Sequence, residues 1–76
     1  MVIISDNSMV INCTGDFVVK VNKIIDEYHL DITLPNIPKA TYTIGIFSSA
    51  EQANNQLNDL AVAIANGDKT YRVNAE

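Results

Sequence analysis

Two stretches of the chain alternate strictly between apolar and polar residues. In residues 28–34, Tyr28, Leu30, Ile32 and Leu34 are separated by His29, Asp31 and Thr33. This period of two is typical of an antiparallel strand with one face in the core and the other in water. Residues 41–46 alternate in the same way and predict a second strand, with inward side chains at Tyr42, Ile44 and Ile46.

Shorter apolar runs predict the remaining strands. Residues 2–5 and 9–12 flank the turn sequence Asp6-Asn7-Ser8 and predict a small hairpin. Residues 17–28 fit either a helix or a strand, and their three valines and two isoleucines favour a strand with a turn near residues 23–27. Pro35 and Pro38 should end the strand before them. Residues 70–74 fit a short edge strand or an extended tail.

A helix is predicted over residues 49–66. Ser48 and Glu51 have the spacing of a capping box, and Gly67 follows Asn66 where a left-handed C-terminal residue is favoured. An apolar stripe at helical spacing should face the sheet, and it consists of Ala53, Leu57, Leu60, Ala61 and Ile64.

The second half of this helix is apolar on every side. Residues 60–65 read LAVAIA, so Val62 and Ala63 are expected to point away from the main stripe. One interpretation is that alanine is simply a good helix former and Val62 touches the chain terminus. The other is a second contact surface for a partner subunit.

These elements predict a single α+β domain over residues 1–76. It would be an antiparallel β-meander of about four to five strands, with one helix on one face and a short C-terminal extended segment. Its core would join the helix stripe to Val19, Val21, Leu30, Ile32, Tyr42 and Ile44. The opposite face of the sheet would be wet, with Lys20, Asn22, His29, Asp31, Thr33, Thr41 and Thr43.

Composition limits the ligands and the cellular compartment that we expect for the protein. The net charge of −4 argues against nucleic acid as a ligand, because such domains usually carry a basic surplus. Cys13 is the only cysteine, which suits a reducing compartment and a role as an apolar filler. No segment has the composition of a signal peptide or the length of a membrane span. We therefore expect a cytoplasmic protein without a membrane partner.

The sequence offers little chemistry. His29 and Asp31 could orient a general base if they paired, but no nucleophile accompanies them, and a solvated sheet face is the simpler interpretation. One histidine and one cysteine are too few for a zinc site, and isolated glycines form no phosphate loop. We predict no enzyme, no catalytic residues, no metal and no cofactor.

Three segments together resemble a loose group of small uncharacterised proteins from Gram-positive bacteria and their prophages. They are residues 7–12 (NSMVIN), residues 34–36 (LPN) and residues 42–53 (YTIGIFSSAEQA). The resemblance implies a strand-rich domain closed by one C-terminal helix. It implies no activity and no functional residues. Ile37-Pro38 replaces the glycine-rich turn that the group leads us to expect.

The function favoured by these observations is protein interaction. We expect a small non-enzymatic module, prophage-encoded if the resemblance holds, that binds a protein partner or itself as a homodimer. Its expected contact residues are Val62, Ala63, Lys20, His29, Asp31 and Thr33. The alternative is an acidic inhibitor that mimics nucleic acid and blocks a DNA-binding protein, for which the dispersed acidic residues give weaker support.

Overall fold

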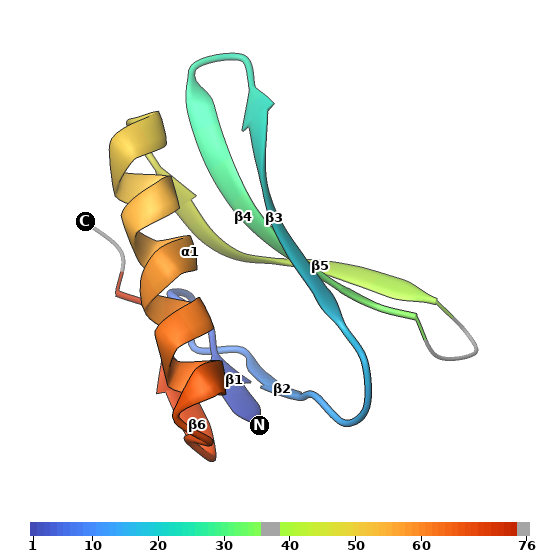
Figure 1. The fold of residues 1–76 in the computed structure, drawn as a ribbon. Helices are drawn as coiled ribbons and strands as arrows, with labels where there is room; N and C mark the ends of the chain where they lie inside the picture. The colour runs from blue at the N-terminus through green and yellow to red at the C-terminus, as the bar shows by residue number, and fades with distance from the viewer. Residues whose placement is uncertain (36–38, 75–76) are drawn as a thin grey trace.

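The computed structural model describes residues 1–35 and 39–74. Within them, six strands and one helix follow one another in the chain (Figure 1). They are β1 (Val2–Ile4), β2 (Val10–Asn12), β3 (Val18–Ile24), β4 (Glu27–Leu34), β5 (Ala40–Phe47), α1 (Ala50–Ala65) and β6 (Thr70–Arg72). This is an α+β fold with the helix packed against a sheet, as predicted. The ambiguous segment 17–28 is a strand followed by a turn, also as predicted.

The strands form two sheets and not one continuous meander. Sheet A has the order β2-β1-β6 and sheet B the order β3-β4-β5. The pairing of β1 with β2 and all pairings in sheet B are antiparallel, whereas β6 runs parallel to β1, with Ile3 opposite Tyr71. The C-terminal segment is therefore an edge strand, one of the two forms expected for it.

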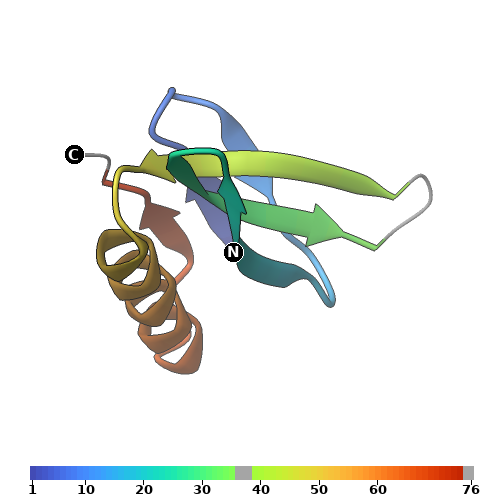
Figure 2. The ribbon, with the colours of Figure 1, turned by 90° about the horizontal axis from the view of Figure 1, so that it is seen from above.

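Helix α1 lies against the inner face of sheet B, where it contacts all three strands. Figure 2 shows the helix to one side of the sheet. Leu30 and Ile32 of β4 are fully buried between the layers, and Ile3 of sheet A joins the same core. Burial of these side chains is the main driving force that holds the layers together.

The N-terminal cap of α1 is Ser49, and the prediction of Ser48 was wrong by one residue. Ser49 has an extended backbone, and its hydroxyl oxygen accepts the amide of Gln52 at 3.2 Å. The Ser48 hydroxyl lies 3.1 Å from Oε1 of Gln52 instead. At the other end, Gly67 has a φ of +75°, the left-handed conformation predicted for it.

The buried side of α1 differs from the predicted stripe. Ala53 and Leu60 are buried as expected, but Ala61 and Ile64 are exposed. Their places are taken by Ala63 and by the polar Gln56, so the buried face is rotated toward β6; the buried residues are Ala53, Gln56, Leu60 and Ala63. The rotation arises because the helix must cover sheet B and Tyr71 of sheet A together.

A β-bulge in β5 reverses the predicted alternation. Leu30 pairs with Gly45 and Asp31 with Thr43, which makes Ile44 the extra residue. Beyond the bulge Phe47 points inward and is 3% exposed, while Ile46 turns outward and is 42% exposed. The prediction that Ile46 points inward was therefore wrong.

The ends of β4 and β5 project away from α1 (Figures 1 and 2). Tyr42 lies in this part of β5 opposite Ile32, and it is exposed because the helix does not reach it. The predicted strand end before Pro35 is confirmed, with β4 ending at Leu34. The prediction for Ile37 and Pro38 lies outside the described residues.

The turn between β1 and β2 covers one edge of sheet B. The amide of Asp6 donates to the carbonyl oxygen of Ile44 at 3.1 Å, and the Asp6 carboxylate accepts the amide of Ile46 at 3.2 Å. Asp6 therefore satisfies backbone groups of β5 at the bulge and protects that edge from pairing with another strand.

Candidate interaction face of sheet B

The face of sheet B that points away from α1 is the candidate functional site, and we call it the outer face. Strand register places alternate residues of the three strands on it, since residues directly opposite one another share a face. The outer face consists of Val18, Lys20, Asn22 and Ile24 from β3, Glu27, His29, Asp31 and Thr33 from β4, and Thr41, Thr43 and Ile46 from β5.

Asp31 lies at the centre of the outer face and is only 9% exposed. One carboxylate oxygen accepts the side-chain amide of Asn22 at 2.6 Å, and the other accepts the hydroxyl of Thr43 at 2.7 Å. Lys20 is directly opposite Asp31 on β3. A buried carboxylate is tolerated only when it is hydrogen-bonded, and here both oxygens have donors. The cluster is therefore held in one geometry, and the predicted fully wet face is corrected at Asp31.

His29 does not pair with Asp31. Its Nε2 atom lies 3.3 Å from Oε1 of Glu27, while the Asp31 oxygens are directed to Asn22 and Thr43. The hypothesised dyad of His29 and Asp31 is thus not formed. Another polar contact on this face joins the hydroxyl groups of Thr33 and Thr41 at 3.1 Å.

Apolar side chains surround the polar centre. Val18 and Ile24 stand at opposite ends of β3, and Ile46 lies opposite His29 on β5; all three are exposed. Sequence reasoning missed Ile46 because the bulge changes its parity. The outward direction of Val18 and Ile24 could have been predicted, because both alternate along β3 with the inward Val19 and Val21.

The other predicted contact residues are divided between the outer face and α1. Lys20 and Thr33 are on the outer face as expected. Val62 is 58% exposed on α1, but Ala63 is 7% exposed and belongs to the core. The pairing of Val62 with Ala63 as one contact surface is therefore corrected, and Val62 is separated from the outer face by the thickness of sheet B.

Outside the outer face, the described residues show no reactive thiol, metal site or membrane-spanning helix. Cys13 is buried, and burial raises the pKa of its thiol, which disfavours the nucleophilic thiolate. Within residues 1–35 and 39–74, no group of three or more His, Cys, Asp or Glu side chains could hold a metal ion. Nor is any helix in these residues long and apolar enough to cross a bilayer.

Comparisons with other proteins leave the site to be interpreted on its own geometry. No family model, curated protein or solved structure matches the chain. The resemblance to small proteins of Gram-positive bacteria and prophages thus stays a prediction.

Proposed function

We propose that the protein is a small non-enzymatic binding module that recognises another protein through the outer face of sheet B. The observation that carries this proposal is the fixed cluster of Asp31, Asn22 and Thr43, bordered by exposed apolar side chains. A preorganised polar group loses little entropy on binding, and neighbouring apolar area supplies the driving force once water is excluded.

The arrangement suits recognition better than catalysis. The Thr43 hydroxyl already donates a hydrogen bond to Asp31, and the imidazole of His29 is beside the Glu27 carboxylate and not beside a hydroxyl group. The buried Cys13 thiol is compatible with a reducing cytoplasm, where we propose that the module acts.

A matched pair of surface variants tests the binding face. Thr41→Arg with Ile46→Asp changes two exposed residues of β5, whereas Val62→Asp changes an exposed residue of α1. Each tagged protein is used to purify partners from the native host at low and high salt. We expect a specific protein that survives high salt, is lost from the β5 variant and is kept by Val62→Asp.

The other outcomes are equally informative. A partner lost only from Val62→Asp would move the binding site to the helix. Recovery of a DNA-binding protein at low salt but not at high salt would support mimicry of nucleic acid, since salt screens exposed charge pairs. Equal recovery of the partner with both variants would overturn the outer face as the binding site.

A further inference from the structure

Strand β3 has a paired neighbour on one side only. It is the first strand in the order β3-β4-β5, and its other edge is unpaired within the described residues. The opposite edge of the sheet is different, because Asp6 contacts β5 at the bulge. An open strand seven residues long is a template for pairing with another strand.

Side chains along β3 complement the same strand running in the opposite direction. In an antiparallel pair of copies centred on Val21, Val18 of each copy lies opposite Ile24 of the other. These two exposed apolar side chains then cover each other at both ends of the pair. Lys20 faces Asn22 in this register, whereas a register centred on Lys20 would oppose two ammonium groups.

The backbone of β3 favours the same register. Ile24 and Glu27 close a two-residue turn, and the closing pair of such a hairpin exchanges hydrogen bonds. Because hydrogen-bonded pairs alternate along the strand, Val19, Val21 and Lys23 direct their N–H and C=O groups toward the open edge. Two copies of Val21 can therefore exchange both hydrogen bonds on the symmetry axis.

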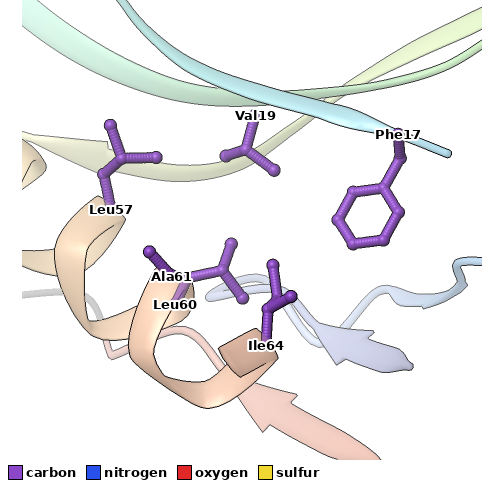
Figure 3. Close-up of a pocket in the computed structure, with 6 residues that line it drawn as sticks. All are labelled: Phe17, Val19, Leu57, Leu60, Ala61 and Ile64. Atoms are coloured by element: carbon purple, nitrogen blue, oxygen red, sulfur yellow. The ribbon is translucent and has the colours of Figure 1, made fainter. Parts of the chain in front are cut away.

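An apolar groove of about 200 Å³ lies beside this edge, between β3 and α1 (Figure 3). Its lining residues are Phe17, Val19, Leu57, Leu60, Ala61 and Ile64. In the register centred on Val21, Phe17 of one copy lies opposite Ile25 of the other. Ile25 is 85% exposed with a φ of +54°, an unusual conformation for a β-branched residue. The groove offers this exposed side chain an apolar site.

We propose that the protein forms a two-fold symmetric dimer by antiparallel pairing of β3 with β3 of a second copy. The two copies of sheet B become one six-stranded sheet with both helices on the same face, and Ile25 of each copy enters the groove of the other. Such an interface uses the same surface on both subunits. The proposal goes beyond partner binding at the outer face and does not depend on it.

Paired charge substitutions test the contact between residues 18 and 24. Val18→Lys with Ile24→Lys places like charges opposite each other, and Val18→Glu with Ile24→Lys places opposite charges there. Both variants carry lysine at position 24, so the contact with Glu27 within the chain is the same in each. Both positions are exposed in the single chain and about 20 Å apart along the strand, so the fold is kept, as circular dichroism would verify. Light scattering over a concentration series then measures the dimer.

The wild-type chain is expected to dimerise, and the Lys/Lys variant should raise the dissociation constant at least about tenfold. The Glu/Lys variant should recover most of this loss. A monomeric wild-type chain, or equal dimerisation of the two variants, would overturn the proposal.

Cross-linking determines the register independently. In a Cys13→Ala background, Val18→Cys with Ile24→Cys should give a disulfide-linked dimer on mild oxidation, because residues directly opposite are within reach of a disulfide. Val18→Cys alone is the control, since its two copies would lie about 20 Å apart. A dimer linked equally well by the single variant would contradict the register.

A substitution of the turn residue Ile25 should weaken the dimer without destabilising the fold of the single chain. Ile25→Asn should relieve the positive φ, because asparagine tolerates this conformation, and should raise the thermal midpoint of the monomer. It should nevertheless weaken the dimer several-fold, since the groove loses its apolar occupant. An unchanged dimer would show that Ile25 does not enter the groove and would overturn that part of the interface.

Discussion

The hydroxyl group of Tyr71 donates a hydrogen bond to the Asp59 carboxylate across 2.8 Å, which joins β6 to the helix. The side-chain amide of Gln56 donates to the same hydroxyl oxygen, and Oε1 of Gln56 accepts the amide of Asn74 at 3.3 Å. Gln56 and Tyr71 are both buried. This network explains why a polar side chain lies on the buried face of α1: it binds the last strand to the helix.

This contact predicts a loss of stability at alkaline pH. Burial, followed by the hydrogen bond to Asp59, raises the pKa of Tyr71 from 10.0 to about 12. The unfolded chain therefore releases the phenolic proton first, so stability is complete below about pH 10 and declines as the pH rises to 12. Urea denaturation of wild type and Tyr71→Phe across this range measures the effect.

The comparison of wild type with Tyr71→Phe isolates the contribution of one residue to the pH dependence. Tyr71→Phe should remove the part of the pH dependence that is due to Tyr71. Parallel curves for wild type and Tyr71→Phe between pH 8 and 12 would contradict the assignment.

Gly45 is required by close packing inside the bulge. A Cβ atom at this position would lie 2.9 Å from a ring carbon of Phe47 and 2.9 Å from Cγ1 of Val73. Gly45→Ala should therefore cost about 1–3 kcal/mol in the free energy of unfolding. In a Val73→Ala background one of the two clashes disappears, so the same substitution should cost less. Equal costs in the two backgrounds, measured by chemical denaturation, would disprove the contact with Val73.

Local signals were sufficient to predict most of the elements. The turn residues between β1 and β2, the alternation in β4 and the helix from Ala53 onward all act through neighbours in the chain. The bulge was not predictable in this way, because it depends on packing in the folded core, where Phe47 and Val73 both lie against Gly45. The same holds for two separate sheets, since β1 pairs with β6 from the far end of the chain.

The candidate site was predictable only as a set of polar residues on one face. Alternation placed His29, Asp31 and Thr33 together, and register confirms it. Their hydrogen-bond partners depend on the neighbouring strands. Asn22 and Thr43 donate hydrogen bonds to Asp31, and His29 lies beside Glu27. A single sequence does not specify that geometry, because it follows from the stagger of three strands around the bulge.

The helix cap gives a test of the one-residue correction at Ser49. Its hydroxyl oxygen accepts the amide of Gln52, so Ser49→Ala should reduce the free energy of unfolding by about 1 kcal/mol. Ser49→Asp is the control, because aspartate also accepts at this position and suits the positive end of the helix dipole. If both substitutions were neutral in thermal denaturation, Ser49 would not be the functional cap.

Three substitutions on α1 determine which side of the helix bears the core. Leu60 is 1% exposed, so Leu60→Ala should cost about 2–5 kcal/mol. Leu57 is only partly buried beside the groove, and Leu57→Ala should cost less than Leu60→Ala. Val62→Ala should be neutral or stabilising by a few tenths of a kcal/mol, because an exposed valine is replaced by a better helix former.

Chemical denaturation at low protein concentration measures all three substitutions without a contribution from dimerisation. A larger loss for Leu57→Ala than for Leu60→Ala would restore the originally predicted stripe as the centre of the core.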